Sequence, residues 1–111
     1  MALTEAVVET TRKTLKVVML DEDDNPLTIT GGAVRLRGAS PDLPGVTLDV
    51  AGTIVDGPNG LCGWAQVGSL VTSANLAGKP SAAFNLRVFL TLGGLTDYGP
   101  LFQFTWFAPP I

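Results

Sequence analysis

The clearest alternation of apolar and polar residues in the chain runs from Phe84 to Leu92. The apolar set is Phe84, Leu86, Val88, Leu90 and Leu92, and the intervening set is Asn85, Arg87, Phe89 and Thr91. Strict alternation over this length is typical of a strand that buries one face. We therefore predict a strand over 84–92 whose other, largely polar face carries one aromatic residue, Phe89.

Further alternating or β-branched segments predict strands at residues 16–20, 33–37, 46–55 with a break at Gly52, 61–67 and 101–107. Turn signals rich in Gly, Pro, Asn and Asp separate them, at 21–26, 38–45, 56–60 and 93–100. Residues 68–81 form a looser connection with room for one short strand or helical turn. Short strands at this spacing favour an all-β fold: an immunoglobulin-like antiparallel β-sandwich of about seven to eight strands.

One domain accounts for the whole chain of 111 residues. Residues 1–14 have mixed character, and we interpret them as an extended N-terminal arm leading into the first strand. The sandwich is predicted over 15–108, with a short C-terminal tail at 109–111. We find neither an internal repeat nor a linker.

Composition excludes several functions. Hydrophobic residues make up 46% of the chain, and charged residues only 15%, below the usual quarter. The chain has no His, which removes the commonest general base and metal ligand, and its single Cys62 cannot form an intrachain disulfide. A net charge of −3 argues against binding nucleic acid. We expect a binding protein rather than an enzyme, with no catalytic residue, cofactor or metal.

No membrane or secretory segment is predicted. Residues 57–78 carry no charge, but Pro58, Asn59, Gln66 and several glycines interrupt them, which disfavours a membrane helix. The N-terminus carries Glu5 and Glu9 before its first basic residue, unlike a secretory signal. We expect a chain made in the cytoplasm.

Candidate chemistry is sparse. The cluster from Asp21 to Asn25 has the first three ligand offsets of a calcium loop. Pro26 stands where such a loop needs Gly, and Gly32 where it needs Glu, so we interpret the cluster as a solvated hairpin turn. Nothing in the sequence brings Asp49 and Asp56 together as a catalytic pair. Cys62, within a predicted strand, is expected to be buried and inert.

The chain resembles the N-terminal domain family of phage baseplate upper proteins. The residues that carry the likeness are KVVMLDEDDNPLTITGGAVRLR (16–37), GTIVDGPNGLCGW (52–64) and the closing AAFNLRVFLTLGGLTDYGPLFQFTWF (82–107). The resemblance spans about residues 15–107 and contains no catalytic motif. It implies an immunoglobulin-like β-sandwich in tailed-phage virions, in baseplates, fibres or head-surface proteins.

The aromatic residues outnumber the positions that one core can hold. We expect Trp64, Phe84, Phe102, Phe104 and Trp106 in the core, while Leu101 and Phe107 face the other side of the last strand. A two-layer sandwich buries one face of each strand, so the surplus predicts a subunit interface. Its candidate residues are Leu3, Val7, Phe89, Leu101, Phe107 and Ile111, joined by Arg35 and Arg37 as contacts to an acidic surface.

Baseplate proteins of this family continue beyond the domain, whereas this chain stops at Ile111. The sequence therefore favours a free-standing capsid decoration protein that binds the major capsid protein, or another virion structural protein, and stabilises the head. We expect a homo-oligomer, with a trimer favoured, located on the virion. The first alternative is a baseplate, tail or fibre-attachment protein. A further alternative is a carbohydrate-binding adhesin that uses Trp106 or Tyr98.

Overall fold

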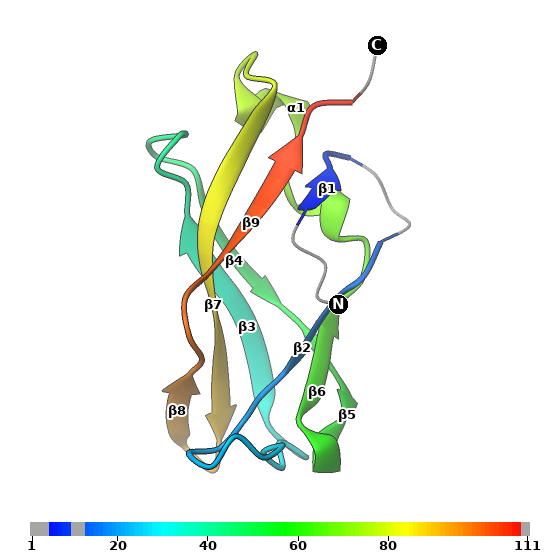
Figure 1. Cartoon of the computed structure of the whole chain (residues 1–111), viewed down its shortest axis with the longest axis vertical. Coiled ribbons are helices and arrows are strands. Elements are labelled where there is room, and N and C mark those ends of the chain that lie inside the picture. The colour runs from blue at the N-terminus through cyan, green and yellow to red at the C-terminus, as the bar shows by residue number, and fades with distance from the viewer. Residues whose placement is uncertain (1–4, 10–12, 110–111) are drawn as a thin grey trace.

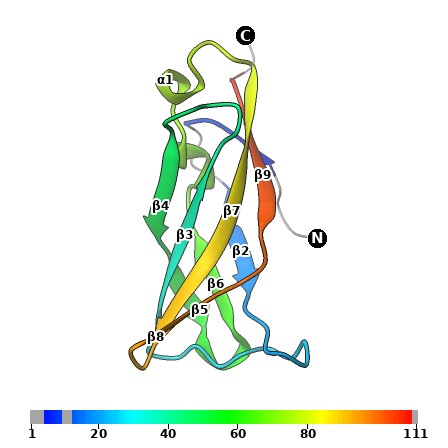
Figure 2. The same cartoon turned by 90° about the vertical axis from the view of Figure 1, so that its left-hand side faces the viewer.

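Two β-sheets packed face to face form an elongated molecule of about 43 × 26 × 21 Å (Figures 1 and 2). This computed structural model describes residues 5–9 and 13–109. The larger sheet has the order β1-β9-β7-β3-β4, with β8 also paired to β7, and the smaller sheet has the order β2-β6-β5. The predicted all-β sandwich is confirmed.

The described residues form nine strands, one more than the upper end of the sequence prediction. The larger sheet contains β1 (Glu5–Val7), β3 (Ala33–Ala39), β4 (Thr47–Ala51), β7 (Ser81–Leu92), β8 (Leu95–Tyr98) and β9 (Phe102–Phe107). The smaller contains β2 (Leu15–Val18), β5 (Thr53–Asp56) and β6 (Leu61–Trp64). Single helical turns lie between strands, namely η1 (Gly57–Asn59), η2 (Val67–Leu70) and α1 (Ser73–Leu76). No described helix is long and apolar enough to cross a bilayer.

Strand β7 is the spine of the larger sheet, and it is longer than its alternating segment predicted. It pairs antiparallel with β3 along one edge and with β9 and then β8 along the other. Its inward side chains, from Ala82 to Leu90, are buried, as the alternation requires. Phe89 lies on the opposite, outer face, as predicted.

Aromatic rings fill the core between the sheets. Phe84, Phe104 and Trp106 have no exposed surface, and Trp106 packs edge-on against Phe84 with ring centroids 5.1 Å apart. Trp64, also buried, lies on the smaller sheet. Each indole N–H donates to a backbone carbonyl, from Trp106 to Val67 at 3.0 Å and from Trp64 to Val50 at 2.9 Å. Both buried Trp side chains are therefore satisfied in the core.

Gly52 marks the point where the chain leaves one sheet for the other. The predicted break in the 46–55 strand separates β4 of the larger sheet from β5 of the smaller one. A Cβ at Gly52 would lie 2.6 Å from Cε2 of Trp64, so a larger residue there would displace the indole ring. The absence of a side chain lets the backbone cross directly over this core tryptophan.

Two features of the sheets differ from the sequence prediction. The 93–100 segment, predicted as a turn, contributes strand β8, because Gly93 and Gly94 at φ 60° and 80° already close a two-residue hairpin. The sandwich is also not wholly antiparallel, since β1 pairs parallel to β9. Residues 5–7 of the predicted N-terminal arm thus form an edge strand of the larger sheet. The amide of the next residue, Val8, donates to the Phe107 carbonyl.

Candidate functional site

The outer side of the larger sheet carries interleaved arginine and aromatic side chains. Strands β3 and β7 and the β8 hairpin place Arg35, Arg37, Arg87, Phe89 and Tyr98 on this side. We call these five residues the arginine–aromatic face. The guanidinium of Arg37 lies 5.0 Å from the Phe89 ring centroid, and that of Arg87 lies 5.0 Å from the Tyr98 centroid. The centroids of the Phe89 and Tyr98 rings are 5.8 Å apart. The two cation–π pairs are therefore in contact and form one cluster that spans β3, β7 and β8.

Asp49 on β4 offsets part of the positive charge of this face. Its Oδ1 accepts from Nε of Arg35 at 2.6 Å and from Nε of Arg37 at 3.1 Å. The hydrogen bond from Arg35, aided by Arg37, holds the pKa of the Asp49 carboxyl below its ordinary value despite some desolvation. All three side chains are about half exposed, so these ion pairs orient the guanidinium groups more than they stabilise the fold.

Arg87 differs from the other two arginines. It lies directly opposite Arg37 in the β3–β7 pairing, where like charges disfavour each other. Its Nε is buried and has no hydrogen-bond partner within the described part of the chain. Three guanidinium groups against one carboxylate give the face a net positive charge, in a chain of net charge −3. The face is therefore suited to an acidic partner.

The Asp49 ion pairs predict a pH dependence of stability. Because the folded pKa of Asp49 lies below its ordinary value of 3.8, the stabilisation is complete above that pH and lost as the pH falls through the folded pKa. We expect Asp49→Asn to lower the urea midpoint at pH 6, by a difference that shrinks as the pH falls below 3.8. Urea titrations at several pH values measure this, and a constant difference at all pH values would contradict it.

The structure places the predicted interface residues at separate sites. Phe89 is half-buried beneath its neighbours in the arginine–aromatic face, and Arg35 and Arg37 belong to that face. Leu101 is 57% exposed and Phe107 39% exposed on or next to β9, while Val7 is half-buried on β1. Leu3 and Ile111 lie outside the described residues. Tyr98, named only for sugar binding, joins the face because β8 forms.

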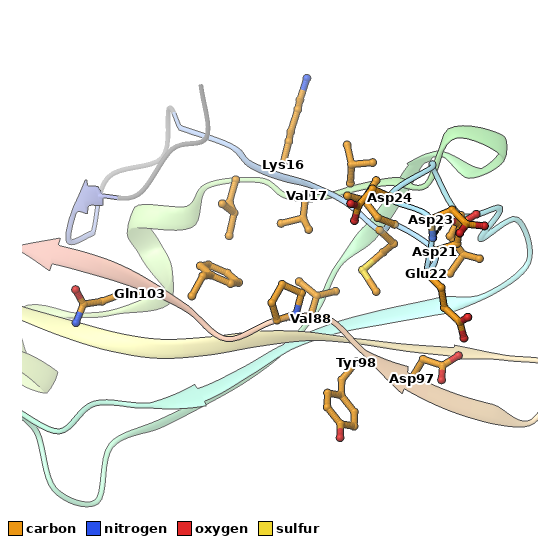
Figure 3. Close-up of a pocket in the computed structure, with 18 residues that line it drawn as sticks. Lys16, Val17, Asp21, Glu22, Asp23, Asp24, Val88, Asp97, Tyr98 and Gln103 are labelled. Carbon is orange, nitrogen blue, oxygen red and sulfur yellow. Dashed lines mark hydrogen bonds between the residues drawn. The ribbon is translucent and has the colours of Figure 1, made fainter.

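A cleft of about 960 Å³ opens on the other side of the larger sheet, between β2 and the β8–β9 connection (Figure 3). Its apolar lining includes Leu15, Val17, Met19, Val88 and Phe102. Its acidic lining consists of Asp21, Glu22, Asp23, Asp24 and Asp97, and Figure 3 shows these carboxylates gathered at one end. Lys16 points away from the cleft, so no described basic side chain neutralises this end.

Four of the five acidic residues of the cleft, residues 21–24, lie in a tight turn. Oδ1 of Asp21 accepts from the amides of Asp23 at 2.9 Å and Asn25 at 3.0 Å, and the Asp21 amide donates to the Asn25 carbonyl. The predicted hairpin turn is thus present, with one Asp21 oxygen committed to the backbone. Within the described ranges, no group of three or more acidic or Cys side chains is placed to hold a metal ion.

The remaining candidates for chemistry have structural surroundings. Cys62 is buried, and burial raises the pKa of its thiol to about 11, which keeps it protonated and unreactive near neutral pH. Asp56, considered as a carboxylate partner of Asp49, instead accepts from the Asn59 side chain at 2.8 Å. The features suited to binding are the arginine–aromatic face and the cleft.

Comparison with known proteins gives structural likenesses but no match in sequence. No family model matches the sequence, and no curated protein matches it. Among solved structures, the chain is similar to the N-terminal domain of phage TP901-1 ORF48, with a TM-score of 0.48 and 10% identity, over 97% of this chain and 85% of that one. A likeness at this level assigns neither a family nor a function.

Proposed function

We propose that this chain is a structural protein of a tailed-phage virion that acts by binding alone. The resemblance of residues 15–107 to phage baseplate upper domains supports the setting. The observation that carries the binding role is the arginine–aromatic face. Arginine and tyrosine are among the residue types that dominate binding energy at protein interfaces, and here Arg87 stacks on Tyr98, which is 62% exposed.

The proposed partner surface is acidic and belongs to another virion structural protein. The guanidinium groups of Arg35 and Arg37 are held by Asp49 and lose little side-chain entropy on docking. An incoming carboxylate would be attracted by the three guanidinium groups of the face, which Asp49 alone offsets. We therefore propose that no reaction is catalysed and that the face serves as a preorganised docking surface.

The finer proposal is decoration of the head, with the major capsid protein as the partner. The specific family resemblance makes the baseplate or tail the alternative location. Separating purified virions into heads and tails, followed by quantitative mass spectrometry of this chain, distinguishes them. We expect a fixed copy number in the head fraction. Recovery with the tails would replace the head proposal, and absence from both fractions would overturn the virion role.

Self-association is part of the proposal. Leu95, Leu101 and Phe107 expose 73%, 57% and 39% of their surface, and burying apolar area of this kind yields about 25 cal/mol per Å². We expect light scattering to give a mass of three chains at micromolar concentration. A mass that stays at 11.6 kDa as the concentration rises would contradict this expectation.

Glycan binding is a second candidate function, favoured by one observation. Tyr98 is 62% exposed and lies beside Arg87, so its ring could stack on an acidic sugar. Trp106, the other residue considered for this role, is wholly buried and cannot take part. Glycan-array binding that is lost on Tyr98→Ala would support this function over the virion role.

A further inference from the structure

The cleft between β2 and the β8–β9 connection lies along an edge of β2 that no other described strand covers. Strand β2 is at the end of its sheet and pairs only with β6 among the described strands. The Met19 amide donates to Gly60, in register with the β2–β6 pairing. Because antiparallel bonding alternates along a strand, Leu15 and Val17 also face β6. The backbone groups of Lys16 and Val18 are therefore directed to the open edge.

On the opposite wall of the cleft, part of the β9 edge is also not paired by another described strand. Strand β1 pairs with β9 from Thr105 to Phe107, so it stops short of Phe102. Phe102 lines the cleft and is only partly buried against the core. On the facing strand, Val17 lines the cleft and is only partly buried. An apolar channel thus runs between the two sheets where another strand would complete the sandwich.

We propose that this cleft binds an extended segment of a partner protein, in which apolar residues alternate and Lys or Arg lies near one end. The segment would add to the free edge of β2 by main-chain hydrogen bonds, as in other strand-addition complexes. Its apolar side chains would lie on Val17, Val88 and Phe102. The cleft volume of about 960 Å³ is at the upper end of the usual range for ligand sites, which suits a peptide.

The acidic end of the cleft favours a partner segment that carries Lys or Arg. Asp97 points inward from β8 toward the end of the cleft where the carboxylates of the 21–24 turn gather (Figure 3). Among the described lining residues, Lys16 is the single basic one, and its side chain points outward. A Lys or Arg at this end would be attracted, whereas an acidic segment, such as the 21–24 turn of a second copy, would be repelled. This site adjoins the arginine–aromatic face at Tyr98, which lines the cleft and also belongs to that face.

The test uses the full chain and an immobilised library of random ten-residue peptides. We expect the recovered peptides to alternate apolar residues and to carry Lys or Arg toward one end. Hydrogen exchange with a recovered peptide should protect the amides of Lys16 and Val18. Recovery of acidic or non-alternating peptides, or of none, would overturn the proposal.

Two substitutions at one position separate strand addition from simple charge attraction. Lys16→Pro removes the outward amide and is compatible with an edge strand, whereas Lys16→Thr removes the same charge and keeps the amide. We expect Lys16→Pro to weaken peptide binding about fivefold relative to Lys16→Thr, with equal thermal unfolding midpoints. Equal affinities of the two variants would overturn strand addition.

A further variant tests whether the acidic end of the cleft, formed by residues 21–24 and Asp97, attracts the basic residue of the segment. We expect the double variant Asp23→Asn and Asp97→Asn to weaken binding of a basic peptide about fivefold at low salt, and less at high salt. An unchanged affinity would overturn the charge assignment. If light scattering instead shows self-association that Lys16→Pro abolishes, the occupant is a second copy, and the basic partner segment is wrong.

Discussion

Trp106→Ala is expected to lower the free energy of unfolding by about 3–5 kcal/mol. The side chain is wholly buried, packs on Phe84 and Phe104 at centroid distances of 5.1 and 4.5 Å, and donates to the Val67 carbonyl. Alanine would leave a cavity and an unpaired carbonyl. Small domains are stable by only about 5–15 kcal/mol, so the variant should unfold at much lower urea concentration.

Phe107→Ala provides the matched control for this loss. It removes an aromatic ring from the next residue of the same strand, but that ring is 39% exposed on the outer side. We expect urea titration followed by circular dichroism to show a loss of about 1 kcal/mol or less for this control. Equal losses in the two variants would contradict the assignment of Trp106 to the core.

The double variant Arg87→Ala and Tyr98→Ala is expected to weaken binding to virions by about a hundredfold or more. Hot-spot arginine and tyrosine residues each contribute about 2 kcal/mol or more at protein interfaces. The two side chains stack on one another, and the Tyr98 ring is 62% exposed. Co-sedimentation of labelled chain with virions assembled without it would measure the affinity.

Lys79→Ala is the control for charge in this experiment. Lys79 is exposed and donates to the Asp42 carbonyl, away from the arginine–aromatic face. The Lys79→Ala variant removes one positive charge, as the double variant does. It should change the affinity for virions less than about threefold. A comparable loss in both variants would show that net charge, rather than this face, governs binding.

Periodicity predicted the sandwich because each face of a half-buried strand imposes its own residue type. The alternation from Phe84 to Leu92 identified the central strand and placed Phe89 outward. The break at Gly52 was also visible in the sequence. What the sequence did not show was that this break transfers the chain between sheets, because contact with Trp64 is a tertiary feature.

The candidate sites were harder to predict than the fold. Arg35 and Arg37 were identified from alternation, but their connection to Asp49 and Arg87 depends on strand order, which alternation does not specify. Tyr98 was missed as a neighbour of Phe89 because 93–100 was interpreted wholly as a turn. The Gly93–Gly94 pair was the signal for a two-residue hairpin, and it would have predicted β8. The cleft depends on two strand edges that stay unpaired within the described part of the chain, and no local pattern encodes this.

Hydroxyl-radical footprinting of the chain on intact virions tests the central claim most directly. Tyr98 is 62% exposed in the arginine–aromatic face, and Val55, 53% exposed on the smaller sheet, is the internal reference. We predict that oxidation of Tyr98 falls strongly when the chain is on the virion, relative to the free chain, while that of Val55 does not. Equal oxidation of Tyr98 in both states, or a chain absent from virions, would contradict docking through this face.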